Sequence, residues 1–206
     1  MKANKIIEFT GIPNSGKTTL IRRLKEELPK RYGISVQVQR EDAEIVPAEI
    51  PKKTWDRNLW ITFGQLQSLV EAYHSDCDIV LLDRGFFDAM FWSSFMLKHD
   101  ITTNEQSCGV NNILIQTYYN LGFHPDYLFL FDTSVEESIK RHSKLGGKCV
   151  YSNPDFLNNY RNHFFEVFKK YIDGNKDITY FYDTTPLTQD ELFEKVAKQI
   201  RTICNK

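Results

Sequence analysis

Two kinds of apolar pattern alternate along the chain: short apolar or alternating runs and longer amphipathic segments. Five short runs predict β-strands, at residues 5–10, 34–39, 78–83, 127–131 and 178–182. Seven longer segments with apolar residues at helical spacing predict α-helices, at residues 17–28, 54–73, 86–98, 105–121, 134–142, 154–171 and 189–200. This alternation favours an α/β fold, in which helices cover both faces of a mostly parallel five-stranded sheet.

The composition fits a single domain spanning residues 1–206. The formal net charge of −1 argues against a surface that binds long nucleic acid. No apolar run approaches the ~18 residues that a membrane span requires, and the first strand leads into a loop without a preceding signal peptide. The four cysteines include no C-x-x-C pair and are expected to be free thiols, so we predict a soluble cytoplasmic protein.

A glycine-containing loop after the first strand carries the clearest chemical signal. The segment Gly11–Thr18 (GIPNSGKT) has the spacing G-x-x-x-x-G-K-[ST] and lies between a strand and an amphipathic helix, as this motif requires. Its glycines let backbone N–H groups point at phosphate oxygens, and the helix directs its positive end at the same anion. We expect Lys17 to contact the β- and γ-phosphates of ATP and Thr18 to bind Mg²⁺; an ordinary turn before a helix is the alternative. The residues predicted to bind the nucleotide are Gly11, Asn14, Ser15, Gly16, Lys17, Thr18 and Thr19.

Charged residues follow two other predicted strands, at the sheet edge where open α/β sheets bind ligands. Asp83 ends a continuous apolar strand and is the predicted second ligand of Mg²⁺, with a helix-capping role as the alternative. Arg84 is predicted to bind a phosphate or the acceptor, with a structural ion pair to Asp83 or Asp88 as the alternative. Arg40 and Glu41 follow the second strand, and we expect Glu41 and Arg84 to face each other across the acceptor site.

On these residues the chain resembles the thymidylate kinase and deoxynucleoside kinase branch of the P-loop kinases. The resemblance rests on the phosphate loop, on the pairs Asp83-Arg84 and Arg40-Glu41, and on two further segments described next. It implies a three-layer P-loop kinase fold with a small helical lid at about residues 133–152. It covers nearly the whole chain in the order of its elements.

The two further segments are an aromatic and glutamine-containing helix and a basic helix. The resemblance implies that Phe63, Gln65 and Gln67 of the first helix bind the acceptor together with Arg40 and Arg84. In the basic segment, Arg141 is the predicted catalytic cation and Lys144 a predicted ligand of ATP, because cations that arrive on closure stabilise the transferred phosphoryl group. The basic residues of this lid are Lys140, Arg141, Lys144 and Lys148, around a hinge at Gly146-Gly147; a solvated helix face balanced by Glu136 and Glu137 is the alternative.

The chain also departs from the family's usual patterns around the acceptor. Gly85 follows Arg84, where thymidylate kinases usually have Tyr after Asp-Arg and deoxynucleoside kinases usually have Glu-Arg-Ser. Asp42 and Ala43 follow Glu41 in place of Pro-Gly-Gly, and the lid lacks a clean R-x-x-x-R. The acceptor is therefore less well defined by the sequence than the donor.

These features predict a kinase that transfers the γ-phosphoryl group of ATP to a small acceptor, most simply a nucleoside or a nucleoside monophosphate. A hydroxyl acceptor would use Glu41 to take its proton, whereas a phosphate acceptor would use Arg40 and Arg84 as clamps. A kinase for a non-nucleotide metabolite or an antibiotic on the same fold is the alternative. A nucleotide-dependent switch is disfavoured, because Asn175-Lys-Asp177 matches the guanine-binding N-K-x-D pattern with the aspartate one place early. The predicted cofactors are ATP and Mg²⁺, with a small phosphoryl acceptor as partner, no long nucleic acid and no membrane; a homodimer is left open.

Overall fold

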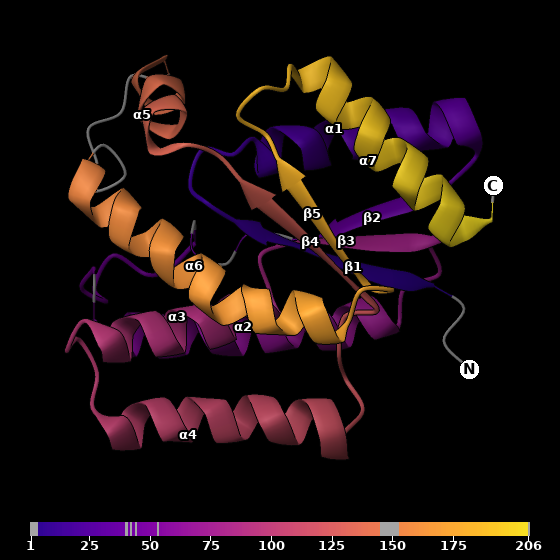
Figure 1. Cartoon of the computed structure of the whole chain (residues 1–206). Coiled ribbons are helices and arrows are strands. Elements are labelled where there is room, and N and C mark those ends of the chain that lie inside the picture. Colours follow the sequence, from indigo (N-terminus) through magenta and orange to yellow (C-terminus); the bar gives the residue numbers. More distant parts are fainter. Residues whose placement is uncertain are drawn as a thin grey trace.

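Five parallel strands form the sheet at the centre of the molecule (Figure 1). The computed structural model describes residues 4–39, 41, 43, 45–52, 54–144 and 153–205, apart from the side chain of Lys170. The strand order is β2-β3-β1-β4-β5, and each neighbouring pair is parallel. The strands are β1 (Lys5–Gly11), β2 (Val36–Gln39), β3 (Ile79–Asp83), β4 (Tyr127–Asp132) and β5 (Thr179–Asp183). The predicted α/β fold with a five-stranded sheet is confirmed.

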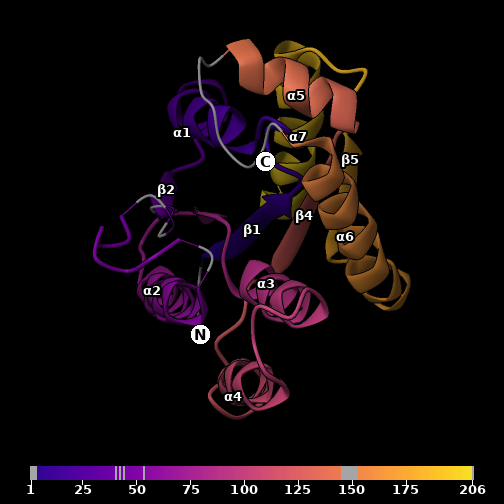
Figure 2. The ribbon, with the colours of Figure 1, turned by 90° about the vertical axis from the view of Figure 1, so that its left-hand side faces the viewer.

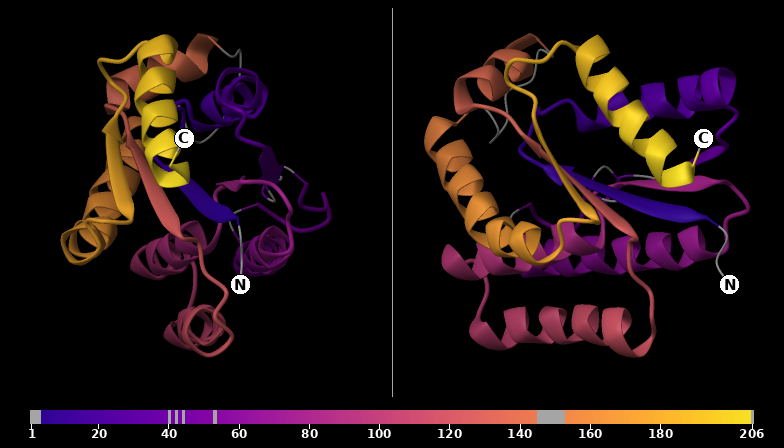
Figure 3. Two further views of the ribbon diagram at one scale, coloured as in Figure 1. Left: turned by 90° about the vertical axis from the view of Figure 1, so that its right-hand side faces the viewer. Right: turned by 45° about the vertical axis from the view of Figure 1, so that its right-hand side comes forward.

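Helices cover both faces of this sheet, as predicted. The helices are α1 (Lys17–Tyr32), α2 (Trp55–Tyr73), α3 (Phe86–Lys98), α4 (Asn104–Ile115), α5 (Val135–Lys144), α6 (Pro154–Gly174) and α7 (Gln189–Cys204). Helices α1 and α7 lie on one face, whereas α2, α3 and α6 lie on the other, with α4 outside them and farthest from the sheet (Figures 1 and 3). Helix α5 follows β4 and lies beyond the carboxyl ends of the strands (Figure 2). The predicted lid segment 133–152 is therefore described only as far as Lys144.

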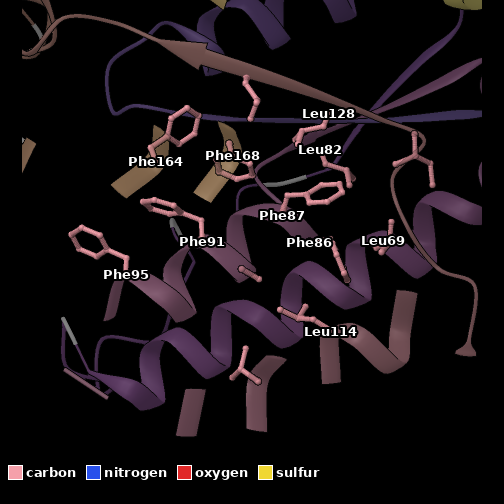
Figure 4. Packing of buried hydrophobic residues seen from close by; sticks show 14 of the residues in the cluster. Leu69, Leu82, Phe86, Phe87, Phe91, Phe95, Leu114, Leu128, Phe164 and Phe168 are labelled. Carbon is pink, nitrogen blue, oxygen red and sulfur yellow. The ribbon is translucent and has the colours of Figure 1, made fainter. Parts of the chain in front are cut away.

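The strand β1 sends alternate side chains into two separate hydrophobic cores. Ile7 and Phe9 pack in the core beneath α1 and α7, and Ile6 packs in the core beneath α2, α3 and α6. Aromatic side chains dominate the second core, where Phe91 of α3 stacks near Phe168 of α6 (Figure 4). A strand that is buried on both faces is mostly apolar, and this is why β1 could be recognised although Glu8 and Thr10 lie within it.

Some element boundaries differ from the sequence predictions. Helix α1 continues through Pro29 to Tyr32, and Gly33 ends it in the left-handed conformation with φ 62°. Pro29 lies in the last turn and is exposed; it has no N–H to donate to the carbonyl of Lys25, so the helix lacks one hydrogen bond there. The helix predicted at 105–121 is α-helical only to Ile115 and continues as a π-helical turn over Gln116–Asn120. None of the described helices is long and apolar enough to cross a membrane.

Candidate functional site

The loop between β1 and α1 is folded around backbone conformations that its glycines allow. Gly11 has φ 147°, and a Cβ atom there would lie 2.0 Å from the carbonyl oxygen of Phe131 in β4. Gly16 has φ 93°, and Asn14 also adopts a positive φ, of 59°. Asparagine tolerates this region better than most residues, because its short polar side chain can bond locally. The loop therefore has the backbone shape that a phosphate cradle requires.

Lys17 lies inside this loop and is buried. Its ammonium group donates to the carbonyl oxygens of Gly11 and Ile12, at 3.1 and 2.9 Å, and to the hydroxyl of Ser15 at 3.2 Å. Burial lowers the pKa of Lys17 to about 8, and the nearby guanidinium of Arg84 acts in the same direction. The ammonium group thus braces the loop from within, in addition to its predicted contact with phosphate.

Thr18 and Asp83 form the oxygen pair expected to hold a cation. The Thr18 hydroxyl donates to Oδ2 of Asp83 at 2.6 Å, while the other oxygen of the buried Asp83 carboxylate, Oδ1, has no hydrogen-bond partner among the described residues. A hard cation such as Mg²⁺ prefers oxygen ligands, and it usually keeps several waters beside one or two carboxylates. The donor set and the unsatisfied oxygen therefore fit Mg²⁺.

Arg84 is held between two carboxylates at the carboxyl edge of the sheet. Its Nε donates to Glu41 at 2.9 Å and its Nη1 donates to Asp88 at 2.9 Å. Glu41 and Arg84 thus lie together, as predicted, but they bond to each other directly; that they face each other across an acceptor site stays a prediction. The ion pair with Asp88, which was the alternative for Arg84, is present. Arg84 has φ 68°, a left-handed conformation that costs a non-glycine residue ~1–2 kcal/mol. Burial raises the pKa of the Glu41 carboxyl, and Arg84 opposes this rise.

Helix α5 is docked on the phosphate loop through Arg141. This guanidinium donates to the carbonyl oxygen of Asn14 at 3.4 Å, and to the hydroxyl and carbonyl oxygens of Thr184 at 3.1 and 2.7 Å. It also pairs with Glu137 one turn earlier, at 3.0 Å. The amide of Asn14 donates to Ser138 of α5 at 3.3 Å, which adds a second link. The lid residues Gly146, Gly147 and Lys148 lie outside the described residues.

These elements enclose a cavity of about 490 Å³. The residues predicted from the sequence that line it are Asn14, Ser15, Gly16, Lys17, Thr18, Thr19, Glu41, Asp83, Arg84, Arg141 and Lys144. Its far wall was not predicted and is formed by the start of α7 and the loop before it, through Thr184, Leu187, Thr188, Gln189 and Leu192. Thr184 directly follows β5, so the rule that selected Asp83 at the end of β3 would also have selected Thr184.

The structure separates the residues predicted to bind the acceptor. In α2, Gln65 is buried, and its Oε1 has no hydrogen-bond partner among the described residues. Gln67 is exposed and donates to Glu71 on the same helix, at 2.9 Å, and Phe63 is 52% exposed. None of these three side chains lines the cavity, and Arg40 lies outside the described residues. Their roles stay predictions.

Curated proteins with similar sequences are thymidylate kinases. The chain is 22% identical to the probable thymidylate kinase of Methanococcus aeolicus over 201 residues, which cover 96% of each protein. It is 28% identical to the thymidylate kinase of Mycoplasma capricolum subsp. capricolum over 204 residues, covering 86% of this chain and 90% of that protein. Both matches cover most of the chain and so extend well beyond the phosphate loop.

A solved structure shares the fold at lower identity. The deoxyadenosine kinase of M. mycoides, in a complex with dCMP and dCDP, superposes with a TM-score of 0.71 at 14% identity. The match covers 96% of this chain and 99% of that one. The family AAA_28, described as an AAA domain, matches residues 6–145, which include the phosphate loop, Glu41, Asp83 and Arg84. Since that match spans more than half of the chain, the protein belongs to the AAA_28 family of AAA domains.

Proposed function

We propose that this protein is an ATP-dependent kinase that transfers the γ-phosphoryl group of ATP to a hydroxyl group of a nucleoside. The sequence relatives named thymidylate kinase and the structural neighbour named deoxyadenosine kinase support a phosphotransferase acting on nucleotides or nucleosides. These names divide between two acceptors, the phosphate of a monophosphate and the hydroxyl of a nucleoside. The chemistry of the site favours the hydroxyl of a nucleoside as the acceptor.

The donor half of the proposed reaction uses the cavity between the phosphate loop, α5 and α7. Backbone N–H groups of the loop and the start of α1 would bind the phosphates of ATP. Lys17 and Arg141, which both line the cavity, would stabilise charge on the transferred group. Thr18 and Asp83 would hold Mg²⁺, which when bound offsets the charge of the β- and γ-phosphates. The docked α5 would exclude water from the reacting atoms.

The observation that carries the choice of a hydroxyl is the pairing of Arg84 with two carboxylates. Glu41 and Asp88 both accept hydrogen bonds from its guanidinium at 2.9 Å, and the Arg84 side chain is only 12% exposed. A phosphate acceptor would have to displace one of these carboxylates or lie beside it, and like charges at such distances repel. A neutral hydroxyl meets no such obstacle. Glu41 lies two residues beyond the end of β2 and could take the proton of the hydroxyl, as a general base must.

Gln65 is the proposed contact for the nucleobase. Its Oε1 and the Nδ2 of Asn58, two turns earlier on α2, are both buried without hydrogen-bond partners. A buried polar group without a hydrogen-bond partner is costly. The acceptor Oε1 of Gln65 and the donor Nδ2 of Asn58, on one face of α2, therefore fit a ligand that offers a donor and an acceptor in return. A planar base presents such groups along one edge. Gln67, which already bonds to Glu71, offers no equivalent unsatisfied atom.

The test is a phosphoryl-transfer assay with labelled ATP and paired acceptors, for example deoxyadenosine against dAMP and thymidine against dTMP. The proposal predicts transfer to the nucleoside of at least one pair and little transfer to its monophosphate. Gln65→Ala should raise the KM for the nucleoside and weaken discrimination between bases, while Gln67→Ala, on the outer face of the same helix, should change neither. Transfer to monophosphates alone would contradict the hydroxyl acceptor, and transfer to none of these compounds would favour a non-nucleotide acceptor.

The proposed location is the cytoplasm, where ATP and reduced thiols are both present. Cys77 and Cys108 are free thiols, which supports a reducing compartment.

A further inference from the structure

Helix α3, which follows the catalytic Arg84, begins without a cap of its own. The residue before it is Gly85, which has no side chain that could accept a hydrogen bond from the first turn. The first N–H groups of any helix lack partners within the helix. In α3, Glu8 of β1 supplies the missing partners. Its carboxyl oxygens accept hydrogen bonds from the N–H of Phe87 at 3.1 Å and from the N–H of Asp88 at 2.9 Å.

Glu8 occupies a position in the central strand where an apolar residue would be expected. Its side chain is fully buried and lies on the same face of β1 as Ile6, toward α3. A carboxyl group in such a place is costly unless its oxygens are bonded. Burial raises the pKa of Glu8 to about 8, against the effect of the two N–H bonds. Because burial of the charged Glu8 carboxyl costs folding free energy, the presence of this residue suggests a role beyond filling the core.

Gly85 and Glu8 are complementary in space. A Cβ atom on Gly85 would lie 3.0 Å from Oε2 of Glu8 and 3.1 Å from its carboxyl carbon. The Glu8 carboxyl therefore takes the room that a side chain at position 85 would need. This accounts for one departure noted in the sequence, the glycine after Arg84 where related kinases usually carry Tyr or Ser. The first turn of α3 is therefore capped by Glu8 of β1 and not by the N-cap residue, Gly85.

The same face of β1 also holds the Asp88 side chain. Thr10, two residues after Glu8, donates from its hydroxyl to Oδ1 of Asp88 at 2.9 Å. That oxygen also accepts from Nη1 of Arg84, and Nε of Arg84 donates to Glu41. An unbroken set of hydrogen bonds thus joins the strand that leads into the phosphate loop to the proposed general base.

We propose that Glu8 is a positioning residue for phosphoryl transfer: it caps α3 from the central strand and thereby fixes Asp88, Arg84 and Glu41. The proposal rests on the kinase function proposed above. Glu8 does not touch the reactants. Its removal should free the first turn of α3, let Asp88 shift, and displace Arg84 and Glu41 by more than the roughly 0.5 Å that catalysis tolerates.

The experiment is a rescue cycle of four proteins: wild type, Glu8→Ala, Gly85→Ser and the double variant. Glu8→Ala should lower kcat on the order of 10- to 100-fold, the usual effect of a displaced reacting group, with the KM for ATP nearly unchanged. Gly85→Ser alone should also impair kcat, because its side chain would meet the Glu8 carboxyl. The double variant should recover much of the activity, since serine is a preferred N-cap and the contacts of its Cβ with Glu8 at 3.0 and 3.1 Å are gone, which leaves the 3.3 Å approach to the end of the Leu82 side chain.

Hydrogen exchange of the Phe87 and Asp88 amides reports the cap directly, and it should quicken in Glu8→Ala and slow again in the double variant. Asp126→Asn is the matched control, because the Asp126 carboxylate also accepts from the backbone of β1, at Ile6, but at the opposite end of the strand. That variant should keep its kcat.

If Glu8→Ala proves too unstable to assay, Glu8→Gln keeps the shape and one accepting oxygen but turns an NH2 group toward the second N–H, and it should show a smaller decrease in kcat. Wild-type kcat in both Glu8 variants, or a double variant no better than Glu8→Ala, would overturn the proposal. An inactive wild type would instead refute the kinase function, so the two failures are distinguishable.

Discussion

Replacement of Glu41 by glutamine separates the two acceptor chemistries most cleanly. The amide keeps the shape of the side chain, and its Oε1 can still accept from Nε of Arg84 at the observed 2.9 Å, so the position of Arg84 should be retained. What is lost is the capacity to take a proton. A positioned general base contributes ~10²–10⁴-fold, which corresponds to about 3–5 kcal/mol of the activation barrier. We therefore expect kcat to fall by that factor while the KM for a nucleoside changes little.

The assay is steady-state kinetics with the nucleoside that the transfer screen selects, and far-UV circular dichroism verifies folding. Glu49→Gln is the matched control, since Glu49 is an exposed glutamate in the same connection between β2 and α2. The reasoning is refuted if Glu41→Gln keeps its kcat and binds monophosphates more tightly. That result would mean that removing a negative charge beside Arg84 frees the guanidinium to bind a phosphate acceptor.

Three further outcomes follow from the donor half and the core. Lys17→Met should abolish transfer and also lower stability, because Lys17 donates three hydrogen bonds inside the loop; turnover and thermal unfolding measured together check this. Asp83→Asn should lower kcat by roughly tenfold or more and raise the Mg²⁺ concentration needed for activity. If the dependence of activity on Mg²⁺ is unchanged, Asp83 does not bind the metal and instead caps the following helix. Folding raises the pKa of Glu8 from 4.5 to about 8, with Asp88 and Tyr171 as its titratable neighbours. Its contribution to stability is thus full below about pH 4.5 and lost as the pH rises to about 8. Denaturant unfolding at about pH 6 and pH 8 should show that the free energy of unfolding of the wild type falls relative to that of Glu8→Gln as the pH rises. If both proteins lose the same amount between the two pH values, Glu8 does not titrate in this range.

Much of the candidate site could be predicted from the sequence because its geometry is local or follows from topology. The phosphate loop needs only the strand before it and the helix after it. The meeting of Glu41 and Arg84 follows from a general property of parallel sheets, whose carboxyl ends lie at one edge. The order of strands was not needed for either inference. The family resemblance added the expectation of a docked basic helix.

The remaining parts depend on contacts between segments far apart in the sequence. Glu8 looks like a polar interruption of an apolar strand, and nothing near it in the sequence points to α3, 79 and 80 residues away. Gln65 and Gln67 could not be told apart, because the rotation of α2 about its axis is set by packing against α3. The position of Lys17 inside the loop reflects carbonyl groups whose orientation only the folded backbone defines.

The sheet order also constrains how the protein can be made. The strand β1 pairs with no segment close to it in sequence, since Lys5 lies beside Ile79 of β3 and Ile7 beside Tyr127 of β4. Because β1 is synthesised before β3 and β4, both of its edges are covered only once β4 has been synthesised. Parallel strands with such distant partners form slowly, because loop closure precedes their stabilising contacts. During that interval the apolar β1 edge is open to pairing with other chains. The same strand order brings Lys17, Glu41, Asp83 and Arg84 together at one edge of the sheet. We therefore expect the yield of folded protein to depend on the rate of translation and on chaperones.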